Sequence, residues 1–302
     1  MQKYVMLTRG RTGSTAILDE FRSIAGVFSV QELFLRWPDG RVPADVMRDF
    51  YRFVLPFDVW KSGPAQEVQA GVPGSAADRE SAATNRIRRL LSRMRGIPLA
   101  QARKYVDATL EGKLHAAYLS YAERMAMQGG GGRLIFKVLS NNLAERKGLT
   151  RVLKDSGYRV LYLVRSNLVR QVLSGLIARK RGAYNRRNYA GDSSTHSIDL
   201  DELEFLVKVE KIRVDEDRAM LKDMAFDFLE VSYEEFCEDR ERFYRRIFEF
   251  MSLPFELPAR TDYSIMTGDL RKQIANFDQL EARVARMGLQ GSLIEDRHVA
   301  CG

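Results

Sequence analysis

The chain has 302 residues, of which 45% are hydrophobic and 29% are charged. This length and apolar fraction are those of a globular protein that buries a core, and they exclude a wholly disordered chain. The formal net charge of +8 at pH 7 predicts a surface that attracts nucleic acid, anionic lipid or small polyanionic ligands, and composition does not choose among the three.

Apolar strands and helices alternate along the chain. Residues 4–8 ("YVMLT") predict a buried strand, and residues 14–25 have apolar side chains at helical spacing. Later strands are predicted at 133–140, at 158–165 and in a segment that ends near Tyr233, and further helices at 99–127, 168–179, 199–224 and 239–252. Because the strands are apolar throughout rather than alternating, we expect an α/β fold with a central, mostly parallel sheet flanked by helices on both faces.

Two stretches interrupt this alternation. Residues 62–83 are rich in Gly, Pro, Ala and Ser, and they predict a long surface loop or a flexible insertion rather than a domain boundary. Residues 84–127 predict helix with a break at 96–98, and residues 182–198 predict a polar loop. We therefore expect one domain over 1–302.

Cysteine usage and the first residues bear on the compartment. Cys237 and Cys301 are far apart in the sequence, which argues against a disulfide framework and a cysteine metal site. The N-terminal residues lack the basic and apolar regions of a signal peptide, and no apolar run has the length of a membrane span. We expect a cytoplasmic protein without a transmembrane segment.

The segment "LTRGRTGSTAILDEF" (7–21) predicts a tight turn between the first strand and the first helix. The first backbone N–H groups of a helix lack internal partners and carry partial positive charge, so such a turn can bind an anion. Arg11 adds a full charge, and the residues after it add a permissive backbone and hydroxyl donors. Alone, the segment fits equally well a glycine turn with a capping serine and an exposed arginine.

A second anion motif follows a later strand. In "LYLVRSNLVRQVLSGL", Arg165 ends the apolar strand and Ser174 lies nine residues later on the next helix. Because ligands of parallel α/β sheets bind where strands end and helices begin, both side chains could converge on one anion. Alone, the pair also fits a strand-end arginine and a buried helix serine.

Together and in this order, the two motifs resemble those of the sulfotransferases that use 3′-phosphoadenosine 5′-phosphosulfate (PAPS), and their style is most similar to the bacterial trehalose-type carbohydrate enzymes. The resemblance implies a P-loop-like sulfotransferase fold, PAPS as sulfuryl donor, 3′-phosphoadenosine 5′-phosphate (PAP) as product, and no metal. It implies that Arg165 and Ser174 hold the 3′-phosphate. It also implies that the 5′-phosphosulfate is held by Arg11, Thr12, Gly13, Ser14 and Thr15.

The same resemblance supplies candidate catalytic residues. Glu32 lies in "FSVQELF" (28–34), which is similar to a Gln-Glu-aromatic segment whose glutamate is the general base. A carboxylate near the acceptor hydroxyl can take its proton as the oxygen attacks sulfur. Lys137, in the strand "RLIFKVLS", matches a lysine near the transferred sulfuryl group, where it would stabilise the developing negative charge together with Arg11.

Two further matches concern the nucleotide. Tyr233, in "VSYEEF", resembles a tyrosine that approaches the adenine, and a buried core tyrosine is the alternative interpretation. Arg271 and Lys272, in "LRKQIANF", resemble an Arg-Lys-Gly loop that closes on the 3′-phosphate, although Gln273 replaces the glycine.

The resemblance also implies a small-molecule or glycan acceptor, with a hydroxyl on a carbohydrate or glycolipid-like group, and it leaves a homodimer possible. We expect the helical segment 84–127 to carry acceptor recognition, with loop 182–198 as a second contact. The histidines show no metal-ligand spacing, and we expect structural or exposed positions for them, with His115 partly buried: His115, His196 and His298.

Two other functions remain open from the residues. The basic segments "RIRRLLSRMR" (86–95) and "RKRGAYNRR" (179–187) are able to supply the electrostatic part of nucleic-acid binding, but no recognised binding module accompanies them, so no nucleic-acid partner is expected. A P-loop-like small-molecule kinase is the other alternative. It is disfavoured because no lysine precedes a Ser or Thr in the 10–15 turn.

Overall fold

The computed structural model describes residues 1–37, 42–51, 53–62, 99–182, 194–261 and 269–293. Residues 63–83 of the predicted 62–83 loop and residues 84–98 of the predicted 84–127 segment lie outside these ranges, as do most of loop 182–198, His298 and Cys301. The helix predicted at 99–127 is confirmed as α6 (Leu99–Gln128).

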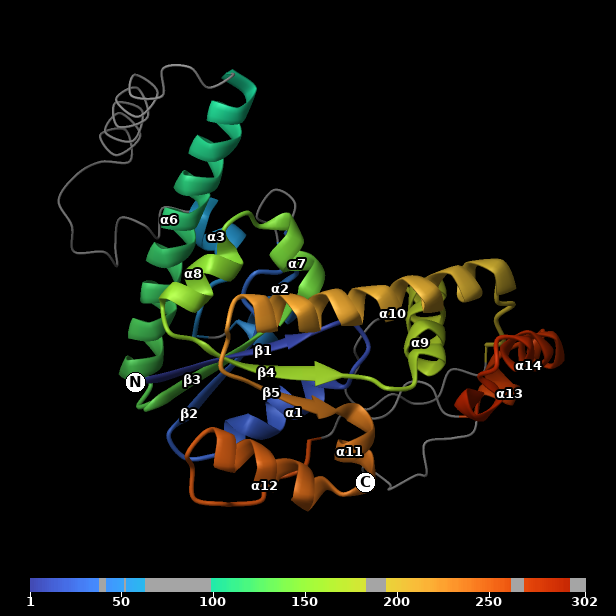
Figure 1. Cartoon of the computed structure of the whole chain (residues 1–302). Coiled ribbons are helices and arrows are strands. Elements are labelled where there is room, and N and C mark those ends of the chain that lie inside the picture. The colour runs from blue at the N-terminus through green and yellow to red at the C-terminus, as the bar shows by residue number, and fades with distance from the viewer. Residues whose placement is uncertain (38–41, 52, 63–98, 183–193, 262–268, 294–302) are drawn as a thin grey trace.

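Five parallel strands form one sheet with the order β2-β3-β1-β4-β5. The strands are β1 (Gln2–Thr8), β2 (Val27–Glu32), β3 (Arg133–Leu139), β4 (Arg159–Val164) and β5 (Phe228–Ser232). Helices flank both faces of this sheet (Figure 1). The predicted α/β fold with a parallel sheet is therefore confirmed.

The helices, like the strands, follow in chain order. The first part of the chain holds α1 (Ser14–Glu20), η1 (Phe21–Ser23), α2 (Ala44–Phe50) and α3 (Phe57–Ser62), and after α6 come α7 (Ser140–Glu145), α8 (Leu149–Asp155) and α9 (Leu168–Arg181). The last part holds α10 (Leu200–Asp223), α11 (Tyr233–Glu238), α12 (Arg240–Phe250), α13 (Leu270–Gln273), α14 (Phe277–Arg286) and η3 (Gln290–Leu293).

The alternation of side chains along each strand divides the core into two layers. Val5 and Leu7 of β1 pack with residues of α6, α8 and α10, whereas Tyr4 and Met6 pack with residues of α1, α11 and α12. Successive residues of a strand point to opposite faces, so a strand that is apolar throughout needs cover on both sides. We call these sides the α10 face and the α1 face; Figure 1 shows α10 on one side of the sheet and α12 on the other.

The first helix and the second strand differ from the prediction. The helix predicted at 14–25 ends at Glu20. A 3-10 turn follows over Phe21–Ser23, and the backbone is extended at Ile24. Gly26, with φ 73°, then turns the chain into β2, a strand that the sequence did not predict. Glu32 is thus the last residue of an edge strand.

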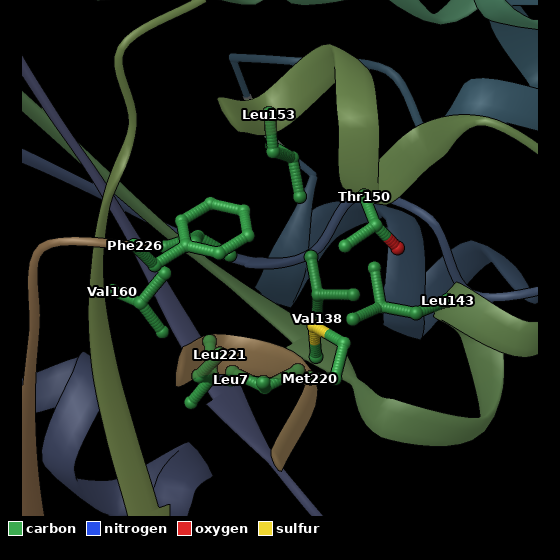
Figure 2. Close-up of a pocket in the computed structure, with 10 residues that line it drawn as sticks. Leu7, Val138, Leu143, Thr150, Leu153, Val160, Met220, Leu221 and Phe226 are labelled. Carbon is green, nitrogen blue, oxygen red and sulfur yellow. The ribbon is translucent and has the colours of Figure 1, made fainter. Parts of the chain in front are cut away.

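A small apolar cavity lies on the α10 face (Figure 2). Leu7, Val138 and Val160 of three strands line its sheet side, and residues of α7, α8 and α10 line the rest. None of the predicted site residues lines this cavity, so it is a gap in core packing. Among the described residues, no helix combines the length and hydropathy that crossing a bilayer requires.

Candidate active site

The topology singles out one point on the carboxyl edge of the sheet. The chain leaves β1 toward β2 on one side, and it leaves β4 toward β5 on the other side. Parallel α/β sheets bind ligands where neighbouring strands send their connections in opposite directions. The loops after β1 and β4 are therefore the first place to look for a site.

The β1–α1 loop (residues 9–13) has an unusual backbone. Arg11, with φ 68°, and Gly13, with φ 73°, both adopt the left-handed conformation. At Gly13 a side chain is also excluded by space, because a Cβ atom would lie 2.6 Å from Cε2 of Tyr233. A non-glycine residue such as Arg11 adopts this conformation at a cost of about 1 kcal/mol, and strained residues of this kind cluster at functional sites.

Buried hydrogen bonds hold this loop in place. The hydroxyls of Thr8 and Thr12 lie 2.6 Å apart, and Thr12 also donates to the carbonyl of Arg9 at 3.2 Å. The Nε2 amide of Gln171, on α9, donates to the carbonyl of Gly10 at 2.9 Å. The loop is thus attached to its own strand and to the helix that follows β4.

The two predicted anion motifs meet at this loop. Arg11 donates from Nε to the hydroxyl of Ser174 at 3.0 Å, across 163 positions of sequence. Arg165 donates from Nη1 to the carbonyl of Arg11 at 3.2 Å, and its guanidinium carbon lies 4.7 Å from the centroid of the Tyr233 ring. The segments that follow β1, β4 and β5 are therefore in contact through cationic, hydroxyl and aromatic side chains.

A second cluster lies on the α1 face at the ends of β2 and β3. Nζ of Lys137 is 2.6 Å from Oε1 of Glu32 and donates to the hydroxyl of Thr15 at 3.1 Å. The side chains of Lys137 and Glu32 are 4% and 16% exposed. A buried ammonium needs a carboxylate and hydrogen-bond acceptors, because isolated charges are costly to remove from water. The cluster therefore joins a candidate base, a candidate cation and the first turn of α1.

Neighbouring groups fix the position of Glu32. Gln31 donates from Nε2 to the carbonyl of Thr15 at 3.1 Å, and Tyr51 donates its hydroxyl to the carbonyl of Glu32 at 2.8 Å. Burial, and after it the charge of Glu32, raises the pKa of the Tyr51 phenol, so this hydroxyl remains a donor at neutral pH. The backbone of residues 31–32 is thus attached to the first turn of α1 and to Tyr51.

The α10 face holds a polar network that was not predicted from the sequence. Arg9 pairs with Glu210 and, at 3.3 Å, with Asp217 of α10. Asp217 also accepts hydrogen bonds from the hydroxyls of Ser140 at 2.7 Å and Tyr162 at 3.4 Å, and burial raises its pKa. Arg9 immediately precedes the predicted "GRTGST" turn. Only its place at the end of an apolar strand signalled that it lies at the carboxyl edge.

The remaining predicted nucleotide residues lie in different surroundings. Tyr233 is 8% exposed and packs against Gly13 and Arg165, which agrees with the alternative of a buried tyrosine. Arg271 pairs with Asp278 at 3.3 Å and with Glu281 at 3.2 Å. Lys272 lies 3.6 Å from Asp269. Both cations therefore pair with carboxylates of their own segment, residues 269–281.

The described histidines have structural surroundings. His115, expected to be partly buried, is fully buried against Phe34 and Phe57. Burial, followed by the charges of Arg146 and Lys61, lowers its pKa to about 4. His196 exchanges backbone hydrogen bonds with Gln273 and Ala275. Within the described ranges, no group of three His, Cys, Asp or Glu residues is arranged to hold a metal ion.

Comparisons with known proteins give only remote similarities. Neither protein-family models nor curated proteins match the chain. Among solved structures, a sulfotransferase domain from the olefin synthase of Synechococcus PCC 7002 shares 17% identity at a TM-score of 0.39, over 84% of this chain and 74% of that chain.

Two further solved structures are similar to the same degree. A sulfotransferase domain from the curacin biosynthetic pathway shares 12% identity at a TM-score of 0.41, over 85% of this chain and 76% of that one. A sulfotransferase from Mycobacterium avium shares 15% identity at a TM-score of 0.40, over 95% and 76% of the two chains. Similarity of this degree does not assign an activity.

Proposed function

We propose that this protein transfers the sulfuryl group of PAPS to a hydroxyl of a carbohydrate or glycolipid-like acceptor and releases PAP. The observation that carries the proposal is the contact between the two anion motifs. Arg11 meets Ser174 at 3.0 Å, and Arg165 meets the Arg11 carbonyl at 3.2 Å, at the edge where parallel sheets bind ligands. A donor with two separate anionic ends suits a pair of such motifs.

The charges and hydroxyls divide into two groups that suit the two ends of this donor. Arg165, Ser174 and the guanidinium of Arg11 form the first group, and we assign the 3′-phosphate to it. Lys137 and the hydroxyl of Thr15, 3.1 Å apart, form the second group, and we assign the phosphosulfate to it. The Arg11 side chain is thus nearer to the first group than the sequence resemblance implied.

The proposed reaction is an in-line displacement at sulfur. The acceptor oxygen forms a new bond to sulfur while the bond from sulfur to the bridging phosphate oxygen breaks, and PAP leaves with that electron pair. Glu32 takes the proton of the acceptor hydroxyl. Lys137 stabilises the negative charge on the bridging oxygen, and its buried position strengthens this interaction.

Nucleotide binding tests the proposal most directly. We expect titration calorimetry to detect tighter binding of PAP than of AMP or ATP. Ser174→Ala should weaken PAP binding about tenfold to a hundredfold, because a hydrogen bond to a charged group is worth about 1.5–3 kcal/mol when it is lost. The matched control is Ser166→Ala, because Ser166 is an exposed serine of the same β4–α9 connection. Weak and unselective binding by the unchanged protein would remove the proposal.

Turnover then tests the base. Glu32→Gln should retain PAP affinity and lose about a hundredfold to ten-thousandfold in sulfuryl transfer, the usual contribution of a positioned base. Glu123→Gln is the control, because Glu123 also pairs with a lysine, Lys3, at 3.3 Å. Full activity of Glu32→Gln would assign the base to another residue. Tighter binding of generic RNA than of PAP, or magnesium-dependent release of phosphate from ATP, would favour the other two functions instead.

A further inference from the structure

Tyr233 and Glu234 contact both the β1–α1 loop and the β4–α9 connection. The Tyr233 ring is 8% exposed and lies against the one position of the β1–α1 loop where a Cβ atom would collide, at 2.6 Å and 2.7 Å from two ring carbons. The ring also lies against the guanidinium of Arg165, 4.7 Å from the ring centroid. The ring therefore lies between the two anion motifs.

Glu234 adds a second attachment to the β4–α9 connection. Its carboxylate accepts from the backbone N–H of Ser166 at 2.9 Å and from that of Asn167 at 3.0 Å. Hydrogen bonds from N–H groups to a charged carboxylate are among the stronger ones in proteins. This bond pair ties the first turn of α9, the helix that carries Ser174, to the start of α11.

The start of α11 is itself held firmly. Ser232 and Glu235 form a reciprocal capping box, with the two hydrogen bonds at 3.1 Å and 2.8 Å. Ser232 also ends β5, in register with Val164 of β4. Tyr233 and Glu234 therefore project from a fixed point next to the strand that leads into Arg165.

From these contacts we infer that Tyr233 and Glu234, the bridging dipeptide, set the separation between the two anion motifs. They are positioning residues that give the site its preference for a nucleotide with both a 3′- and a 5′-phosphate over one with a 5′-phosphate alone. This inference rests on the proposed function, because PAP and AMP are the ligands that differ in the 3′-phosphate.

The physical reason is preorganisation. The ring keeps the β1–α1 loop at a fixed distance from Arg165 and holds the guanidinium by a cation–π contact. Glu234 keeps the turn that leads to Ser174 from moving away. A ligand that contacts only one motif gains little affinity from this fixed separation. A ligand that contacts both motifs binds more tightly, because the two motifs are already ordered before it binds.

The test compares affinities for PAP and AMP in two matched pairs of variants, all as the full chain. Tyr233→Met keeps an apolar side chain and removes the ring, and its control Phe236→Met makes the same change on the same helix at a residue that is 6% exposed. Glu234→Gln removes one negative charge, and its control Glu238→Gln removes another from the exposed end of the same helix. Because Glu234 lies in part at the surface, its variant gives a result even where Tyr233→Met does not fold.

We expect the ratio of the AMP and PAP dissociation constants to fall about fivefold to tenfold in Tyr233→Met and Glu234→Gln, and to stay within about twofold of the unchanged protein in both controls. A loss of general stability would lower melting temperatures in all four variants without changing this ratio. The ratio therefore reports positioning and not folding.

Two results would overturn the inference alone, given an unchanged protein that prefers PAP. One is an unchanged ratio in both bridging variants. The other is tighter PAP binding by Glu234→Gln, since that would mean the carboxylate competes with the ligand for the amides of Ser166 and Asn167. Equal affinity of the unchanged protein for PAP and AMP would instead remove the proposed function, and the role of the bridging dipeptide with it.

Discussion

Each face of the sheet holds a buried cation against carboxylates near the carboxyl edge. On the α1 face Lys137 pairs with Glu32, and their side chains are 4% and 16% exposed. On the α10 face Arg9 pairs with Glu210 and Asp217, and these side chains are 10%, 17% and 13% exposed. Burial and ion pairing alone therefore do not separate a candidate reaction centre from a structural network.

The further partners of the two clusters make the difference. Asp217 accepts from Ser140 and Tyr162 as well as from Arg9, so the α10-face network ties β4 and the residues that follow β1 and β3 to one helix. Lys137 instead donates to the hydroxyl of Thr15, the second residue of α1. We therefore expect the α10-face network to contribute stability, and the proposed function assigns the chemistry to Lys137, whose partner Thr15 lies in the first turn of α1 beside the candidate anion loop.

The largest effect that this comparison predicts is the loss of Lys137. We expect Lys137→Met to lower kcat about a hundredfold to a thousandfold, because a preorganised cation at a developing negative charge is worth about 3–4 kcal/mol of transition-state stabilisation. Lys3→Met is the control, since Lys3 is also a strand lysine paired with a glutamate, at 3.3 Å. The measurement is the rate of sulfuryl transfer by each folded variant. A near-normal kcat in Lys137→Met would mean that the cluster of Lys137, Glu32 and Thr15 has a structural role.

The loss of Arg9 should have the opposite signature. Arg9→Met leaves Glu210 and Asp217 without their cation, and breaking a buried pair in this way costs about 3 kcal/mol of the free energy of unfolding. Denaturant unfolding measures the loss, with Arg218→Met as the control because Arg218 is an α10-linked arginine at the surface, 38% exposed. A stable Arg9→Met protein that has lost turnover would break the comparison and bring the α10-face network into the site.

A smaller effect, on pH dependence, is expected from His115, which lies on the α10 face. Its pKa is lowered to about 4, so the unfolded chain binds its proton more tightly than the folded chain. Stability from this residue is complete above the unfolded pKa, which is about 6.5, and about 3 kcal/mol of it is lost as the pH falls to 4.

Chemical unfolding at several pH values measures this contribution. His115→Met should show a shallower fall of stability between neutral pH and pH 4 than the unchanged protein. Other groups titrate in the same interval, so the quantity of interest is the difference between the two curves. Parallel curves would mean that His115 has the same proton affinity in the folded and unfolded chains.

Sequence reasoning went further for the fold than for the site. The apolar strands predicted the parallel sheet, and the rule that ligands bind at its carboxyl edge predicted that Arg165 and Ser174 could converge on one anion there. Their hydrogen bonds with Arg11 appear only in the folded chain. The strand β2 was missed because "VFSVQE" mixes polar and apolar residues, as an edge strand does when only part of its surface is covered.

Contacts between distant residues were beyond the reach of local patterns. The hydrogen bond of Arg9 to Asp217 joins residues 208 positions apart, and the sequence around either residue does not predict the other as its partner. The predicted roles of Glu32 and Lys137 came from separate motifs, and their 2.6 Å ion pair appears only when β2 and β3 lie side by side. Pairing partners of this kind depend on strand order, which periodicity does not encode.

The smallest predicted effect separates the position of Glu32 from its charge. Tyr51 donates its hydroxyl to the backbone carbonyl of Glu32 at 2.8 Å and not to its carboxylate. Tyr51→Phe should therefore lower the free energy of unfolding by about 1 kcal/mol, the usual net worth of one hydrogen bond, and change kcat less than about threefold. Tyr121→Phe is the control, because Tyr121 accepts from a backbone N–H at 3.4 Å away from Glu32. A loss of kcat as large as that of Glu32→Gln would mean that the carboxylate acts as a base only when the backbone carbonyl of Glu32 is held. The α1-face cluster would then include Tyr51, the residue that follows α2.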